Sequence, residues 1–181
     1  MAAIDIGGIE VPDNRPVFLA ALAVHVLAGL VSVVAGARAA LARKQPGWHP
    51  RAGRVYLAGI SGIFATATVL AALRWREDRH LFGIAVVALG LAATGLAARR
   101  RAWPRWPLWH GLAMGGSYIT LLTGFYVDNG PQLPLIDDLP HVLYWVVPAA
   151  VGIPVIVVAL VRNGALGAGD RTVSRAGRPV R

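Results

Sequence analysis

The chain contains no cysteine, which excludes disulfides, zinc–thiolate sites, iron–sulfur clusters and thiol nucleophiles. Charged residues are also scarce, at 15% of 181 residues, against about 25% in an average soluble domain. Hydrophobic residues make up 56% of the chain, and the mean hydropathy is +0.56. These proportions exclude an ordinary soluble globule and predict a membrane protein.

Acidic and basic residues are absent from five long apolar stretches. The stretches are 16–37, 55–73, 81–98, 107–127 and 142–161. At about 1.5 Å per residue, a helix of this length crosses a hydrocarbon core of about 30 Å. Because a backbone in lipid must satisfy its own hydrogen bonds, each stretch is expected to be a helix. The predicted fold is an all-α integral membrane bundle of five transmembrane helices over residues 16–161, with no strands.

Two segments flank this predicted domain. Residues 1–15 carry acidic residues where a signal peptide would carry a basic region, so we expect an external segment and no cleavage of the first stretch. Residues 162–181 are rich in glycine and arginine and have little to bury, so we expect a disordered, basic cytoplasmic tail.

Charge alternates between successive loops. Segments 38–54 and 99–106, together with the tail, carry 14 basic residues and one acidic residue. The N-terminal segment, 74–80 and 128–141 carry four basic and eight acidic residues. By the positive-inside rule, the N-terminus is outside and the C-terminus is cytoplasmic. The expected location is the inner membrane of a bacterium, with several passes.

The net charge of +9 follows from these loops. Basic residues that flank membrane spans contact anionic headgroups, so the expected partners are the lipid bilayer and its anionic lipids, and not nucleic acid. Small residues at helical spacing, such as Gly111 and Gly115, are typical of helix interfaces in membranes. A homodimer or a larger membrane complex therefore stays open.

His25 is the one histidine well inside the predicted hydrocarbon region. An ionisable group at that depth is a functional hypothesis, and the alternative is a neutral ring bonded to a neighbouring helix. The helical rise places Tyr118 of the fourth stretch at the same depth and Thr66 of the second close to it. The sequence therefore predicts an intramembrane polar site of His25, Tyr118 and Thr66, with Tyr118 as the first partner and Thr66 as the second.

The remaining histidines lie near the ends of the spans. A cytoplasmic rim cluster is predicted where the second and fourth spans begin, with the members His49, Arg51, Arg54, Tyr56 and His110. Histidines near carboxylates at the outer ends are weak metal candidates, because their spacing is not diagnostic. These are His80, His141, Asp137 and Asp138. A b-type haem needs two axial histidines at one depth, which leaves only the pairs His49/His110 and His80/His141.

The runs HVLAGLVSVVAGARAALAR and WHPRAGRVYLAGI combine a histidine and a glycine in the first span with a basic entry into the second. A further histidine and a tyrosine follow in the fourth span. This pattern resembles the bacterial membrane family called domain of unknown function 2306, over about residues 17–127. The matching positions are His25, Gly29, His49, Gly53, Arg54, Tyr56, His110 and Tyr118, and Pro50 departs from the pattern.

The resemblance implies a small polytopic membrane protein and no particular activity. The favoured function is a membrane binding or accessory module built around the two predicted sites. The first alternative is a redox protein that binds b-type haem or quinone. The second is a small transporter or proton relay that uses His25. Whether the chain is an enzyme stays open.

Overall fold

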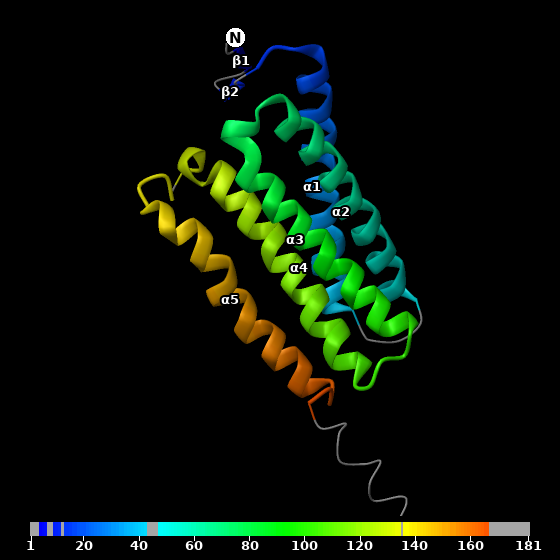
Figure 1. Cartoon of the computed structure of the whole chain (residues 1–181). Coiled ribbons are helices and arrows are strands. Elements are labelled where there is room, and N and C mark those ends of the chain that lie inside the picture. The colour runs from blue at the N-terminus through cyan, green and yellow to red at the C-terminus, as the bar shows by residue number, and fades with distance from the viewer. Residues whose placement is uncertain (1–3, 7–8, 12, 43–46, 135, 167–181) are drawn as a thin grey trace, which may run out of the picture. The chain divides into compact units, whose positions relative to one another are not determined.

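The computed structural model describes residues 4–6, 9–11, 13–42, 47–134 and 136–166. Five long helices follow one another along the chain (Figure 1). They are α1 (Pro16–Leu41), α2 (Trp48–Leu73), α3 (Trp75–Arg100), α4 (Trp106–Asn129) and α5 (His141–Arg162), with a 3-10 helix η1 (Gly130–Gln132) after α4. The predicted all-α class is confirmed. Most of the predicted disordered tail lies outside the described residues.

Four of these helices, α1, α2, α3 and α5, are long and apolar enough to cross a membrane. The chain is therefore a multi-pass helical membrane protein. Helix α4 has 24 residues but is less apolar, because it carries four glycines, two threonines, a histidine and a serine. Its crossing of the membrane stays a prediction.

The helices extend beyond the apolar stretches. Helix α2 begins at Trp48, so Arg51 and Arg54 lie on its first two turns, where the sequence predicted a loop. Only Arg74 separates α2 from α3, so most of the predicted loop 74–80 is helical as well. A helix does not have to end where its apolar residues end. Acidic residues such as Glu77 and Asp78 stabilise the first turn of α3, because they lie near the positive end of its dipole.

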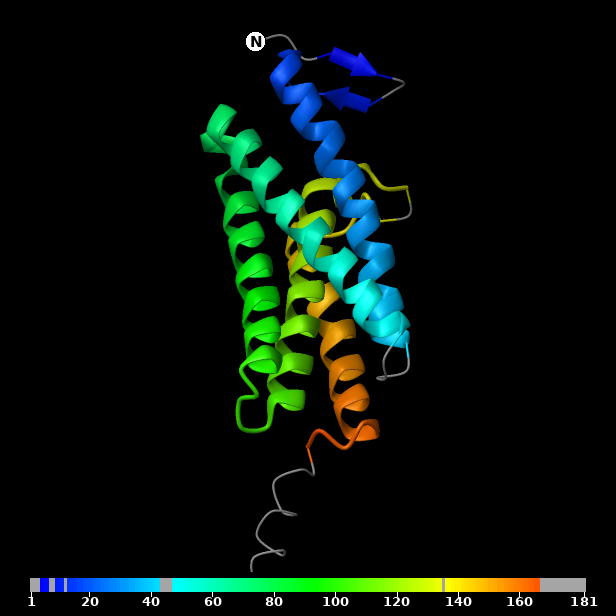
Figure 2. The ribbon, with the colours of Figure 1, turned by 90° about the vertical axis from the view of Figure 1, so that its right-hand side faces the viewer.

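The expectation of no strands is wrong for the N-terminal segment. Strands β1 (Ile4–Ile6) and β2 (Ile9–Val11) form an antiparallel hairpin, with Ile4 opposite Val11 and Ile6 opposite Ile9 (Figure 2). The sequence carried the signal, since two apolar–acidic–apolar triplets flank a Gly-Gly pair. Strands of three residues are far shorter than a membrane-spanning stretch, so hydropathy over long windows does not indicate them.

The chain divides into two compact units, residues 1–89 and 90–181, and α3 contributes to both. In the first unit, α1 and α2 are antiparallel and approach closely at Gly59. Ser32 is completely buried, and its hydroxyl donates to the Ala28 carbonyl at 2.7 Å. A Cβ at Gly59 would clash with the Ser32 hydroxyl and lie 3.3 Å from the Ala28 oxygen. A glycine is therefore required for this contact.

In the second unit, α4 and α5 are antiparallel, and glycines of α4 receive large side chains of α5. A Cβ at Gly111 would lie 2.6 Å from Leu160, and one at Gly115 would lie 2.5 Å from Ile156. In the middle of the two helices the roles are reversed, because Gly152 of α5 faces Ile119 of α4. Gly111 and Gly115 therefore serve as holes for branched side chains of a neighbouring helix within the chain.

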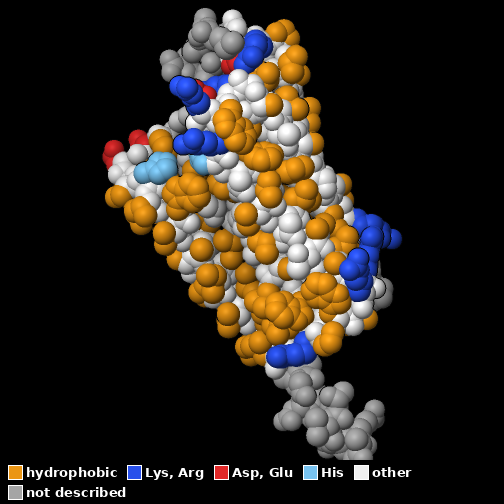
Figure 3. Space-filling view, viewed as in Figure 1, with side chains coloured by type: hydrophobic (Ala, Val, Ile, Leu, Met, Phe, Trp, Pro, Cys, Tyr) orange, Lys and Arg blue, Asp and Glu red, His pale blue; other side chains and the backbone are white. Residues whose placement is uncertain are grey.

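Apolar side chains cover much of the outer surface of the helices (Figure 3). On α1, residues three or four positions apart are large, apolar and exposed, among them Val24, Leu27, Val31 and Val34. An exposed apolar surface of this extent is typical of a protein that is solvated by lipid.

The close contact at Gly59 can be tested on a single helix. Gly59→Ala should lower the free energy of unfolding by about 1–3 kcal/mol, because the added methyl group overpacks the interface. Gly53→Ala on the same helix is the matched control, since nothing lies within 4 Å of a Cβ there. It should be neutral or stabilising by up to about 1 kcal/mol, because alanine is the better helix former. Unfolding of the purified protein in detergent measures both, and equal effects would refute the close contact.

Candidate functional site

His25 of α1 lies against Thr66 of α2. The His25 Nδ1 atom is 2.9 Å from the Thr66 Oγ1 atom. Thr66 Oγ1 is also 2.8 Å from the Gly62 carbonyl oxygen and 3.0 Å from that of Ile63. A hydroxyl has one proton, which it donates to these carbonyls, so towards the ring it acts as an acceptor. The proton of a neutral His25 ring is therefore on Nδ1.

This contact bears on the predicted intramembrane site. Thr66, the second of the two expected partners, is within hydrogen-bonding distance of His25. Tyr118 belongs to the other unit, and its pairing with His25 stays a prediction. The threonine hydroxyl closes a short chain of hydrogen bonds that leads from the ring of α1 to the backbone of α2. Such a chain joins two helices where water is absent.

His49 and His110 occupy equivalent positions in two helical hairpins. His49, in the first turn of α2, has its Nδ1 atom 2.9 Å from the Ala39 carbonyl oxygen of α1. His110, near the start of α4, has its Nδ1 atom 2.9 Å from the Gly95 carbonyl oxygen of α3. A carbonyl only accepts, so Nδ1 donates in both rings. Each histidine therefore ties the beginning of one helix to the end of the preceding helix.

The repeated dipeptide Trp-His could have revealed this similarity, since Trp48 precedes His49 and Trp109 precedes His110. The aromatic surroundings differ between the hairpins. The Arg38 guanidinium lies 5.9 Å from the Trp48 ring centre, and the Trp106 ring lies edge-on to His110 at 6.3 Å.

Four members of the predicted rim cluster lie on α2. Arg51 and Arg54 are exposed, whereas Tyr56 is among the most deeply buried side chains, at 2% exposure. His49 is half-buried. His110 belongs to the second unit, so a single cluster of all five residues stays a prediction.

The weak metal candidates lie on exposed positions. His80 is exposed near the start of α3, and Asp137 and Asp138 are exposed in the connection before α5. His141 begins α5, and its ring stacks edge-on against Tyr144 at 5.8 Å. Within the described ranges, no three His, Asp or Glu side chains come together as ligands for one ion.

An apolar cavity of about 140 Å³ lies in the second unit, where the connection between α4 and α5 meets these two helices. Its walls are formed by Tyr126, Ile136, Leu139, Leu143, Tyr144 and Val147. The Tyr144 hydroxyl donates to the Ile136 carbonyl at 2.6 Å, which fixes one wall. The cavity offers little polar surface, so it suits a hydrocarbon group better than a polar ligand.

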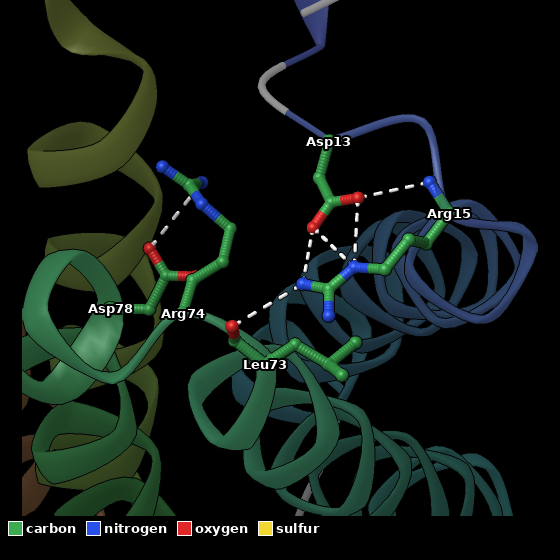
Figure 4. Close-up of polar contacts among 5 residues, drawn as sticks. All are labelled: Asp13, Arg15, Leu73, Arg74 and Asp78. Carbon is green, nitrogen blue, oxygen red and sulfur yellow. Dashed lines mark hydrogen bonds and ion pairs between the residues drawn. The ribbon is translucent and has the colours of Figure 1, made fainter. Parts of the chain in front are cut away.

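The sequence analysis missed an ion pair that closes one end of the α1–α2 hairpin. Arg15 donates from Nε to both carboxylate oxygens of Asp13, at 3.0 and 2.8 Å, and also from Nη2 (Figure 4). The backbone N–H of Arg15 donates to the same carboxylate at 2.9 Å. The Nη2 atom further reaches the Leu73 carbonyl at 3.3 Å, at the last residue of α2. The positive charge of Arg15 at this position interacts favourably with the negative, C-terminal end of the α2 dipole.

The neighbouring residues extend this network. Arg74 pairs with Asp78 at 3.8 Å, and its guanidinium lies 5.8 Å from the Phe18 ring centre. The hydrogen bonds from Arg15 hold the pKa of Asp13 below its ordinary value, against the opposing effect of burial. The same bonds raise the pKa of Arg15. No motif in the sequence predicts the contact of Arg15 with Leu73, because 58 residues separate the partners.

The Asp13 ion pair predicts a pH dependence of stability. A carboxyl group whose pKa is lowered by folding stabilises the protein above its unfolded pKa of about 4. This stabilisation is lost as the pH falls through the lowered, folded pKa. Asp13→Asn should therefore lower the melting temperature at neutral pH, and the gap to the wild type should close in acid. Asp138→Asn, at an exposed position, is the control, and a gap independent of pH would contradict the prediction.

The His25–Thr66 bond predicts a specific effect of the threonine hydroxyl. Thr66→Val should cost about 1 kcal/mol of stability, which is typical of one hydrogen bond between membrane helices. Thr66→Ser should restore most of it, and a His25→Leu/Thr66→Val double variant should lose less than the sum of the single changes. Thr68→Val is the matched control, since the exposed Thr68 donates to the Phe64 carbonyl in the same way. Equal losses at Thr66 and Thr68 would show that the histidine contributes nothing.

No family model, no curated protein and no solved structure matches this chain. Its class therefore follows from its own residues. Four helices that are long and apolar enough to cross a bilayer, with hydrogen-bonded polar groups between them, identify a multi-pass helical membrane protein.

Proposed function

We propose that the chain is a five-span protein of the bacterial inner membrane that acts as a membrane-embedded binding or accessory module, with its N-terminus outside and its C-terminus in the cytoplasm. The observation that carries the orientation is the separation of charge within each unit. In the second unit, the exposed residues Arg99, Arg105 and Arg162 lie at one end of the helices, and Asp128 and Asp138 lie at the other.

The first unit supports the same orientation. Arg38, Arg51 and Arg54 lie where α1 ends and α2 begins, and no described acidic residue lies there; at the opposite end of this hairpin the arginines are balanced by Asp13 and Asp78, which pair with Arg15 and Arg74. Basic residues are retained on the cytoplasmic side during insertion. Two units with the same polarity of charge along their helices support one orientation for the whole chain.

Helix α4 is proposed as the fifth span because of its packing against α5. The contacts between Gly111 and Leu160 and between Gly152 and Ile119 join the two helices from one end to the middle. A helix that runs antiparallel beside a membrane-spanning helix is exposed to the same solvent. The glycines and threonines that lower its hydropathy are residues that membrane helices use for close packing.

A binding or accessory role is supported by the use of the polar groups between the helices. In the part of the chain that the structure describes, every buried side-chain nitrogen or oxygen has a hydrogen-bond partner. His25 bonds to Thr66, and Ser32 bonds to the backbone of its own helix. The His25–Thr66 bond joins α1 to α2, and the Ser32 bond stays within α1. We also propose, from the resemblance in sequence, that the chain is related to the polytopic membrane family called domain of unknown function 2306.

A redox protein that binds b-type haem is the second candidate, favoured by one observation. His49 and His110 each donate Nδ1–H to a backbone carbonyl, which fixes the orientation of each ring. Histidines that ligate metals are commonly oriented by such a bond from the other ring nitrogen. An absorption spectrum of the purified protein decides between the candidates. If the wild-type protein shows a Soret band, and the band disappears in both His49→Leu and His110→Leu, the haem-binding function replaces the first proposal.

The proposed topology can be tested with single cysteines, since the natural chain has none. Cysteines at the exposed positions Arg79 and Asp138 should react with a membrane-impermeant maleimide in intact cells. A cysteine at Arg101 should react only after the membrane is permeabilised. A reversed pattern would refute the orientation, and equal labelling at Arg101 and Asp138 would refute the crossing of α4.

A further inference from the structure

We propose that the α3–α4 turn is a docking surface for the headgroups of anionic phospholipids. The name α3–α4 turn is used here for six residues of the second unit: Arg99, Arg100, Arg101, Arg105, Trp106 and Trp109. The inference deepens the proposed function and rests on its crossing of the membrane by α4. The partner is a phosphate diester held at the membrane surface, and not a phosphate free in solution.

The four guanidinium groups of the α3–α4 turn are exposed, and none of them forms an ion pair with a carboxylate among the described residues of the second unit. Among the described residues, the two ion pairs of the structure involve other arginines, Arg15 and Arg74. The described acidic residues of the second unit are Asp128, in the last turn of α4, and Asp137 and Asp138, beyond the end of that helix. Among the described residues, the turn therefore presents four positive charges without a carboxylate partner, and an anionic ligand would compensate them.

The position of the turn indicates lipid as that partner. The apolar part of α3 ends at Ala98, which is completely buried, and the charged residues begin at Arg99. Trp106 and Trp109 start α4 three residues apart, with 40% and 48% of their surfaces exposed. Exposed tryptophans are typical of the level at which hydrocarbon meets headgroup. The guanidinium groups next to them consequently lie at the depth of the lipid phosphates.

The backbone holds this surface in a fixed shape. Ala102 and Arg105 adopt left-handed conformations with φ of 48° and 56°, which are uncommon outside glycine. The N–H of Trp103 donates to the Ala98 carbonyl at 3.1 Å, and that of Trp106 donates to the Trp103 carbonyl at 2.9 Å. Strained conformations that surrounding contacts maintain are concentrated at ligand-binding sites.

Side chains, and not backbone amides, are the binding groups. The N–H groups of Leu108 and Trp109 donate to the Arg105 carbonyl, at 2.9 and 3.3 Å. The first turn of α4 therefore has few amides left for an anion. A planar guanidinium donates two parallel hydrogen bonds to a phosphate, which makes arginine well suited to this contact.

The experiment compares two pairs of arginines at opposite ends of α3. The full chain is placed in nanodiscs of phosphatidylcholine, and the binding of phosphatidylglycerol is followed by native mass spectrometry. Arg99→Gln/Arg100→Gln should weaken binding roughly tenfold or more, since each basic residue near an anionic surface contributes about fivefold. Arg76→Gln/Arg79→Gln, two exposed residues near Glu77 and Asp78, is the matched control and should leave binding unchanged.

A third variant separates charge from folding. Arg99→Lys/Arg100→Lys keeps the charge and loses the two parallel hydrogen bonds, so it should bind more strongly than the glutamine variant and less strongly than the wild type; a loss as large as that of the glutamine variant would overturn the proposal. Equal losses at both ends of α3 would also overturn it, as would displacement of phosphatidylglycerol by inorganic phosphate or by an oligonucleotide at equal concentration. The cysteine labelling of Arg101 and Asp138 reports on the topology independently of these results.

Discussion

The lack of water in the hydrocarbon core of a bilayer is the constraint on which the rest of this structure depends. A polar group in hydrocarbon costs several kcal/mol unless it has a partner. Ser32 satisfies this requirement within its own helix, whereas His25 satisfies it through Thr66 of the neighbouring helix. A polar side chain that finds its partner on another helix, as His25 does, therefore also helps to determine which helix faces meet.

Close contact between helices follows from the same constraint. Lipid is as apolar as leucine, so burial of hydrocarbon alone does not drive helices together, and tight packing must contribute instead. Gly59 leaves room for the Ser32 hydroxyl and the Ala28 carbonyl of α1, and Gly111 leaves room for the Leu160 side chain of α5. The glycines that lower the hydropathy of α4 are thus residues that allow α5 to pack against it.

The ends of the helices follow different rules, because they reach water and headgroups. Arg15 joins the carboxylate of Asp13 to the last carbonyl of α2, and His49 and His110 join helix beginnings to preceding helix ends. These contacts use one chemistry, in which a side-chain N–H bonds to a backbone carbonyl near the C-terminal end of a helix. They fix the hairpins at their ends, while glycine packing fixes them in the middle.

The sequence by itself determined the class of the protein and the approximate position of every helix, because uninterrupted apolar stretches have one solution in lipid. It did not determine where α2 and α3 begin, since a helix extends into water by local rules that hydropathy does not capture. It named Thr66 as a partner of His25 from depth alone, but ranked it second, because depth along the membrane normal says nothing about which helix lies alongside. Only the tertiary structure decided the contact of Arg15 with Leu73 and those of the two histidines with carbonyls. Backbone carbonyls are the same at every residue, so their partners depend on which helix ends meet in space.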